Sequence, residues 1–391
     1  MRKFIDQFLL VLASVAIPLG FWVYRYLVSL LVAGMGVGIV YAIVSVVCPD
    51  LTHEPPAERY WVGAALLLAA MLFLWSLKET RRDNPYRRYV GLSGFVNKLI
   101  DRFIAWIGTI KYFTQPMGLV QDPGSYKIHG NEIRELIDKV LQPGDILLRG
   151  YDGYLDGIMI RLSGGGSSLS RHFSHAAYYA GDLIEARDKP IVARRLQVMN
   201  ESGDWVEASE DQKDKVRNDP GYFESGRQRV IHAMTKGVFT EDILTFVRCD
   251  HLVVLRLPPT MSIGPGERQS FDPLIAQLAP DARQIQQKLL SGETVTREEV
   301  LERVHASALG KIGSCYNFQF NDGKKYNRFS CSEFVYYCFK SVHAYLGLHM
   351  VKHGFLGFLF VRESITPADI FDAAIQTKKL EVVWTSRSLQ S

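Results

Sequence analysis

The chain has 391 residues, of which 47% are hydrophobic, 22% charged and 12% aromatic. This composition excludes a disordered or collagen-like chain, and 45 Lys and Arg against 41 Asp and Glu do not favour a nucleic-acid-binding role. The five cysteines are odd in number and form no CxxC pair. We therefore expect no disulfide framework, no metal or organic cofactor, and a reducing compartment.

The N-terminal quarter is strongly apolar. Tyr26 to Cys48 contains no charged residue and is long enough for a transmembrane helix, and Trp61 to Leu77 is a second such run. Small residues predict that the two helices pack closely as a hairpin; they are Gly34, Gly36, Gly38, Ala64, Ala65, Ala69 and Ala70. We expect residues 1–90 to anchor the chain in a lipid bilayer through two or three spans.

The number of spans depends on Gln7 to Tyr24, which is uncharged but interrupted by Pro18 and Gly20. A third span, a kinked half-helix and an interfacial segment all fit this pattern. A cleaved signal peptide is a further alternative, since Arg2 and Lys3 precede the apolar stretch, but no A-x-A site follows.

Charges beside the apolar runs predict the orientation. Five cations follow the second run, namely Lys78, Arg81, Arg82, Arg87 and Arg88, whereas the loop between the runs is mostly acidic. The positive-inside rule then assigns the rest of the chain to the cytoplasmic side of an inner or plasma membrane. In residues 91–125, apolar side chains from Phe95 to Ile110 recur at helical spacing, which predicts an amphipathic juxtamembrane helix and linker, or equally an ordinary domain helix.

From residue 126 to 391 the pattern changes to short apolar runs separated by turn residues, which predicts one α+β domain. We expect helices and strands at Asn131 to Leu141 (helix), Asp145 to Arg149, Ser174 to Gly181, Arg229 to Ala233 and His251 to Leu257 (strands), and Ser330 to Ser341 (helix). The polar segment Asp182 to Gln228 is predicted to be an insertion with structure of its own, and it could dock a protein partner.

Cys331 is the first candidate for chemistry. It is expected at the first turn of an amphipathic helix, in FSCSEFVYYCF. Backbone N–H groups and the helix dipole stabilise a thiolate there and can also receive an oxyanion. A small core residue is the alternative reading of such a cysteine, and we accept that alternative for Cys338.

A thiol nucleophile needs an imidazole base and a group that orients the imidazole. His175 lies in the strand-like SHAAYYA, where alternation groups it with Ala177 and Tyr179 on one face. His232, in RVIHA, falls on the neighbouring strand if the insertion is set aside. Taken alone, each fits a strand histidine with an ordinary hydrogen bond, and His172 fits a loop histidine.

Several segments occur together in one order, and their sequences are PGDILLRG (143–150), FSHAAYYAG (173–181), VIHAMTKGVF (230–239), VVLRLP (253–258), SCYNFQFN (314–321), FSCSEFVYYCF (329–339) and ITPADIF (365–371). In this order the chain resembles the permuted papain-like cysteine hydrolases, the YiiX-like branch of the NlpC superfamily. The resemblance spans roughly residues 130–385. It implies a circularly permuted papain-like fold with an antiparallel sheet and helices.

The resemblance also implies site residues. Cys331 corresponds to the nucleophile, His175 to the general base and His232 to the orienting residue. Glu185, in DLIEA, also resembles the orienting segment, so that both assignments stay open. Asn317 departs from the family, which usually has Asp at this position.

Together these observations predict a membrane-anchored cysteine hydrolase or acyltransferase. It would act through a thioester on an amide, ester or thioester of a peptide or acyl-lipid substrate. A periplasmic domain would instead favour cell-wall peptides. The alternative is a catalytically silent binding module that keeps the papain-like scaffold.

Overall fold

The structure is a computed structural model that describes residues 2–47, 57–80, 95, 99, 126–152, 167–202, 204–264, 280–317, 326–355 and 360–390. It divides into two compact units. One holds residues 1–110 and 199–205, and the other holds residues 111–198 and 206–391.

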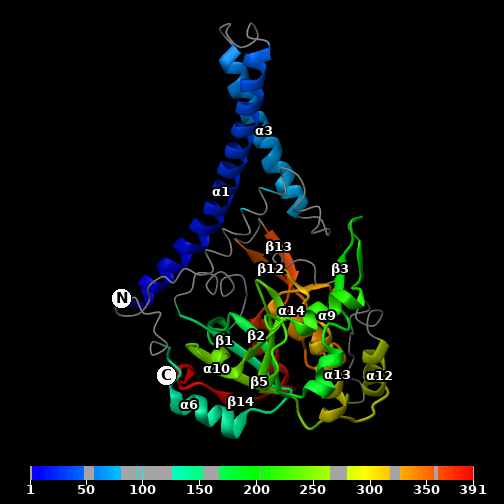
Figure 1. Ribbon diagram of the computed structural model, residues 1–391. Coiled ribbons are helices and arrows are strands. Elements are labelled where there is room, and N and C mark those ends of the chain that lie inside the picture. Colours follow the sequence, from blue (N-terminus) through cyan, green and yellow to red (C-terminus); the bar gives the residue numbers. More distant parts are fainter. Residues whose placement is uncertain are drawn as a thin grey trace. The chain divides into compact units, whose positions relative to one another are not determined.

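Two antiparallel helices, α1 (Arg2–Val47) and α3 (Ala57–Thr80), form the helical unit (Figure 1). Helix α1 continues through Pro18 and Gly20, so Gln7 to Tyr24 belongs to the same helix as the apolar run that begins at Tyr26. Proline removes only one backbone hydrogen bond from a helix, and the apolar residues on both sides favour helix. At about 1.5 Å per residue, a helix of 46 residues is roughly 69 Å long.

The contact between α1 and α3 confirms the predicted hairpin, and it confirms the predicted role of small residues for Ala69 but not for the glycines. Ala33 and Ala69 are fully buried in it, and Tyr26 and Tyr41 of α1 meet Phe73 and Trp61 of α3 edge to face. By contrast, a Cβ added at any of the three glycines of the GMGVG segment (Gly34, Gly36 and Gly38) would meet nothing within 4 Å. Alanines and aromatic rings therefore hold the helices together.

One stretch among the described helices is long and apolar enough to cross a membrane, Val23–Val47 in α1. The apolar part of α3, Tyr60–Leu74, is shorter. It spans about 22 Å as a helix, less than a hydrocarbon core of about 30 Å. The cations at 81–88, and residues 91–125 apart from the helical Phe95 and Leu99, lie outside the described residues.

A six-stranded antiparallel sheet in the order β14-β7-β1-β2-β5-β6 organises the second unit. Its strands are β1 (Ile146–Gly150), β2 (His175–Leu183), β5 (Gly226–Met234), β6 (Gly237–Asp242), β7 (His251–Arg256) and β14 (Glu381–Thr385). Every residue of β1 is buried because it lies between β7 and β2. The four strands predicted from the sequence are thus confirmed.

Helices cover both faces of the sheet (Figure 1). Ala176 and Tyr178 of β2 belong to the larger apolar core, together with α14 (Cys331–Cys338), α13 (Arg297–Gly310) and α15 (Pro367–Thr377). Ala177 and Tyr179 belong to the smaller core, with α6 (Gly130–Glu135), the π-helical turn Leu136–Val140 and α10 (Ile243–Phe246). The unit is a mixed α+β fold, as predicted.

The segment between β2 and β5, predicted as a structured insertion, contains α8 (Glu185–Asp188), a 3-10 turn (Lys189–Ile191), the paired strands β3 (Gln197–Met199) and β4 (Trp205–Glu207), and α9 (Glu210–Asn218). The remaining elements are a 3-10 turn (Ser170–His172), β8 (Thr260–Met261), α12 (Pro280–Leu290), β9 (Val295–Thr296), β10 (Cys315–Tyr316), β11 (Arg328–Phe329), β12 (Val351–Phe355), β13 (Phe360–Ser364) and a 3-10 turn (Arg387–Leu389).

Candidate functional site

Cys331 is the first residue of α14, as predicted. Ser330 caps the helix, because its hydroxyl accepts the Glu333 N–H while the Glu333 carboxylate accepts the Ser330 N–H at 2.8 Å. This reciprocal capping box fixes where the helix begins. The N–H groups of Cys331 and Ser332 have no partner one turn earlier within the helix, which is the general condition of a helix N-terminus.

The thiol of Cys331 differs from expectation. It is 4% exposed, and burial raises its pKa above the ordinary cysteine value. The backbone N–H of Ala176 and the groups of Ser332 oppose that rise. Desolvation disfavours a thiolate more than these donors stabilise it. The direction of this shift is opposite to the one predicted from the position of Cys331 at a helix N-terminus.

The two predicted histidines lie together. Nε2 of His175, on β2, is 2.8 Å from Nδ1 of His232, on the adjacent β5. The rings meet edge to face with centroids 5.0 Å apart. Because one ring nitrogen must donate and the other accept, this contact fixes complementary tautomers on the pair.

Aromatic rings and one cation surround the histidine pair. Phe246 contacts both rings, and Phe239 packs on His232, which is fully buried. Arg149, paired with His175 across β1 and β2, lies 4.1 Å from the Phe246 ring centroid. Burial first, and the Arg149 charge second, lower the pKa of both histidines well below the ordinary value. Lower pKa values favour the neutral form of both rings, and they also make each ring a weaker proton acceptor than an ordinary imidazole.

Two further residues extend this pair and were not predicted as site residues. Oε2 of Glu241 lies 3.6 Å from Nε2 of His232 and 3.5 Å from Nη1 of Arg149. Arg149 also donates to the Phe246 carbonyl oxygen at 2.9 Å. A sequence signal for Arg149 existed, since a charged residue ended an otherwise apolar buried strand and such residues are rarely buried without a partner. Glu241 carried no comparable signal.

Cys331 approaches the histidine pair from the other face of the sheet. Helix α14 packs on the face that carries Ala176 and Tyr178, whereas His175 shares the opposite face with Ala177. The thiol reaches the backbone N–H of Ala176, the residue after His175. Within the described residues no hydrogen bond joins the thiol to either imidazole, and its nearest polar side chain is Ser332, with Oγ 3.7 Å from Sγ.

The alternative orienting residue, Glu185, lies elsewhere. It follows the far end of β2, while His175 begins that strand. Its side chain is 64% exposed and pairs with Lys189 at 3.4 Å. Of the two candidates, only His232 meets His175.

Asn317 lies buried against the carboxylate that caps α14. Its side-chain amide donates to both oxygens of Glu333, at 3.2 and 2.9 Å, and both residues are buried. An aspartate here would bring a second carboxylate against Glu333, whose pKa is already raised by burial. Asparagine supplies the donor that this buried capping carboxylate needs.

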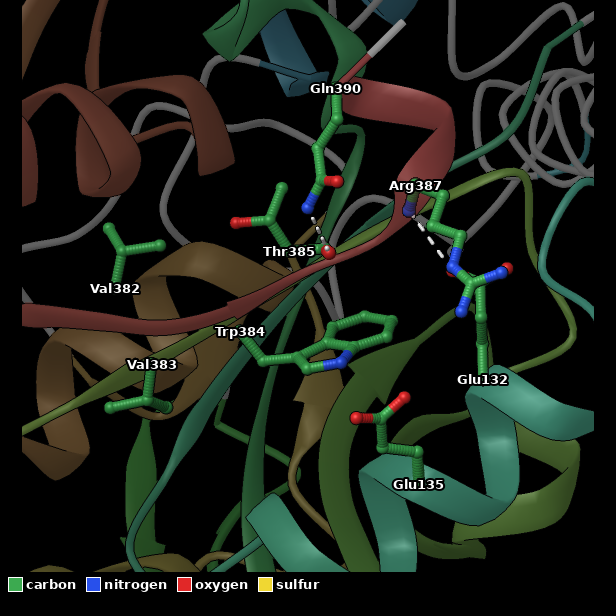
Figure 2. Close-up of a pocket in the computed structure, with 8 residues that line it drawn as sticks. All are labelled: Glu132, Glu135, Val382, Val383, Trp384, Thr385, Arg387 and Gln390. Carbon is green, nitrogen blue, oxygen red and sulfur yellow. Dashed lines mark hydrogen bonds between the residues drawn. The ribbon is translucent and has the colours of Figure 1, made fainter.

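A surface hollow of about 410 Å³ lies away from these residues. Figure 2 shows Trp384 and Glu132 among the residues that line it, and Glu132 accepts the Arg387 N–H at 3.0 Å. None of Cys331, His175 and His232 lines it.

Among the described residues, one group of side chains could together hold a metal ion. It consists of Asp152, His172 and His251.

Comparisons with known proteins add no assignment. No family model, curated protein or solved structure matches the chain. The case for function therefore depends on the residues themselves.

Proposed function

We propose that the second unit is a cysteine hydrolase or acyltransferase with a circularly permuted papain-like fold of the YiiX-like type. The carrying observation is the 2.8 Å contact between His175 and His232, beside a helix-opening cysteine whose thiol lies against the amide of residue 176. Six antiparallel strands with a helix packed on one face are compatible with this fold.

In the proposed reaction, Sγ of Cys331 attacks the carbonyl carbon of an amide, ester or thioester. His175 takes the thiol proton and returns it to the leaving group, and a thioester remains on Cys331. The N–H groups at the start of α14 stabilise the oxyanion. Water or an amine then resolves the thioester, with His175 removing its proton.

His232 acts as a positioning residue. When its Nδ1 accepts the Nε2–H of His175, the other nitrogen of His175 is the one that takes the thiol proton. His232 then carries its own proton on Nε2, which faces Glu241 at 3.6 Å. These contacts stabilise a positive charge on His175 only after it has taken the proton from the Cys331 thiol. They are consistent with a thiol that is neutral before the reaction.

The membrane part of the proposal depends on α1 and α3. Val23–Val47 would cross the bilayer, α3 would form a second pass, and the cations after it would keep the hydrolase unit in the cytoplasm of a cell with an inner or plasma membrane. A substrate with an acyl chain or lipid anchor fits this location. Fusion of green fluorescent protein or alkaline phosphatase to the C-terminus tests the orientation, because only one of them is active on each side.

Acylation of Cys331 tests the chemistry. The full chain in detergent is incubated with short- and long-chain aryl esters and acyl thioesters, and intact-mass spectrometry records the acyl adduct. Cys331→Ser removes the adduct, whereas Cys338→Ala keeps it, since burial raises the pKa of Cys338, on the same helix, to about 12. An adduct that persists in Cys331→Ser would sink the proposal.

A second candidate is a silent binding module. The burial of Cys331, its raised pKa and the lack of a hydrogen bond from its thiol to either described histidine favour this reading. The insertion between β2 and β5 would then dock a protein partner. A chain that forms no adduct with any of these acyl donors, yet stays folded, would establish this second reading instead.

A further inference from the structure

A second imidazole cluster lies at the same end of the sheet as His175. Gly150 ends β1 and pairs with His251, the first residue of β7. A Cβ at Gly150 would lie 1.7 Å from the carbonyl oxygen of His172, so only glycine lets the 3-10 turn before β2 approach this closely. The rings of His172 and His251 lie with their centroids 4.5 Å apart and their planes tilted by 49°.

A carboxylate completes the cluster. Oδ2 of Asp152 lies 3.0 Å from Nε2 of His251. One ligand atom from each of Asp152, His172 and His251 lies within 4.8 Å of the others. Two imidazoles and one carboxylate suit a borderline divalent transition metal, with Zn–N and Zn–O bonds of about 2.0–2.2 Å. Two ligand atoms 3.0 Å apart match neighbouring positions around such an ion.

The hydrogen bonds behind His251 make its Nε2 a ligand. The Ser388 hydroxyl donates its only hydrogen to the Asp250 carbonyl oxygen at 2.6 Å. The hydroxyl oxygen of Ser388 lies 3.2 Å from Nδ1 of His251, so that Nδ1 donates to this oxygen when the hydroxyl hydrogen is directed to Asp250. In neutral His251 the Nε2 lone pair then points at an Asp152 oxygen, and two acceptors facing each other require a cation or a second proton.

A second layer of contacts fixes the carboxylate. Asp250 accepts the Asp152 N–H at 2.7 Å and the Lys127 N–H at 3.2 Å through its two oxygens. Lys127 also donates its ammonium to Asp152 Oδ2 at 2.5 Å. The structure thus already supplies one cation to Asp152. Outer partners of this kind orient the ligands in metal sites.

We propose that Asp152, His172 and His251 form a Zn²⁺ site in which the ion competes with the Lys127 ammonium for Asp152. The site ties the segment after β1, the start of β7 and the turn before His175 to one ion. It is independent of Cys331 and of the proposed hydrolysis. Its role is structural, because it would fix the turn that precedes His175.

Zinc titration of the full chain tests this site. The protein is stripped with a chelator, and calorimetry measures Zn²⁺ and Mg²⁺ binding while thermal unfolding is followed in parallel. We expect saturable binding of one Zn²⁺ per chain, a higher unfolding temperature, and no response to Mg²⁺, which prefers oxygen ligands. An absence of saturable Zn²⁺ binding would leave His251 and Asp152 as an ordinary hydrogen-bonded pair and would overturn the proposal.

Variants locate the ion. Asp152→Asn and His172→Asn should each weaken binding at least about tenfold. Lys127→Met should strengthen it by a similar factor because the competing ammonium is gone, a gain that misfolding cannot produce. Cys331→Ser should bind zinc as the parent does, and Co²⁺ in place of zinc should give no thiolate charge-transfer band. Loss of binding in Cys331→Ser, with retention in Asp152→Asn, would place the ion at the thiol and refute the site.

Discussion

Two imidazole clusters at one end of the sheet differ in the groups that their ring nitrogens contact. His175 and His232 bond to each other at 2.8 Å among aromatic rings, with Glu241 only at 3.6 Å. His251 has a carboxylate at 3.0 Å and a hydroxyl on its other nitrogen. The first arrangement favours uncharged imidazoles, whereas the second places a carboxylate beside imidazole nitrogens, an arrangement that attracts a cation. The surroundings of a histidine, rather than its presence, therefore decide its chemistry.

The largest expected difference between the clusters comes from comparing one substitution in each. His175→Ala should lower the rate of Cys331 acylation by about a thousandfold, since it removes the proton acceptor, and should leave zinc binding unchanged. His172→Asn, three residues away, should do the reverse. Stopped-flow release of the aryl alcohol and calorimetry measure the two effects on the same preparations. Loss of both activities in either variant would show that the clusters are one site.

His232 gives the next largest effect. His232→Leu should slow acylation about a hundredfold, because His175 loses the acceptor that holds its tautomer. His232→Asn should recover much of that loss, since its side-chain oxygen can accept the same Nε2–H, as asparagine does in papain-like triads. Equal rates for the two variants, compared at matched folded fractions by circular dichroism, would reduce His232 to a packing role.

The sequence predicted the elements around these clusters better than their interiors. Strand alternation grouped His175 with Ala177, and the structure confirms that grouping because the sheet separates two apolar cores. The start of α14 beside Cys331 was likewise predicted correctly, and the capping box of Ser330 and Glu333 explains it. Local patterns of this kind depend on neighbours a few residues apart, so the sequence contains them.

Contacts between distant residues were beyond such patterns. Asp152 and His251 are 99 residues apart, and Arg149 and Glu241 are 92 apart, so no spacing could pair them. The sign of the Cys331 pKa shift was wrong for a related reason: the helix terminus is local, but burial depends on β2 and the whole core packed above it. Pro18 shows the converse, where a local breaker was overridden by its apolar surroundings.

The two clusters also differ, by a smaller expected effect, in how they make the stability of the protein depend on pH. Burial lowers the pKa of His175 and His232 below the unfolded value of about 6.5. Both histidines therefore take up protons when the chain unfolds below that pH. The free energy of unfolding consequently decreases as the pH falls. Each histidine contributes a slope of at most about 1.4 kcal/mol per pH unit. The free energy of unfolding, measured with urea, should therefore fall as the pH is lowered from 7 to 5. His232→Asn should remove about half of this pH dependence.

Asp152 supplies the control for this measurement. Hydrogen bonds and charge from His251 and Lys127 outweigh the effect of burial and lower its pKa, so its contribution is constant above pH 5 and is lost only under stronger acid. Asp152→Asn should shift the stability curve downward without changing its slope between pH 7 and pH 5. A changed slope in this variant would couple the two clusters electrostatically.

The smallest expected effect comes from Lys236, an exposed cation that lowers the pKa of His232 and lies 3.6 Å from the Phe239 ring centroid. Lys236→Met should raise the pKa of the histidine pair, so the acid limb of the acylation rate should move to higher pH by about 0.3 units at low salt. The shift should vanish near 1 M salt, where screening acts within about 3 Å. Arg227→Met is the matched control, since that exposed cation pairs with Asp182 at 3.9 Å. An equal shift in both variants would mean that the net charge of the protein, and not the position of Lys236 beside the histidine pair, determines the pH of the acid limb.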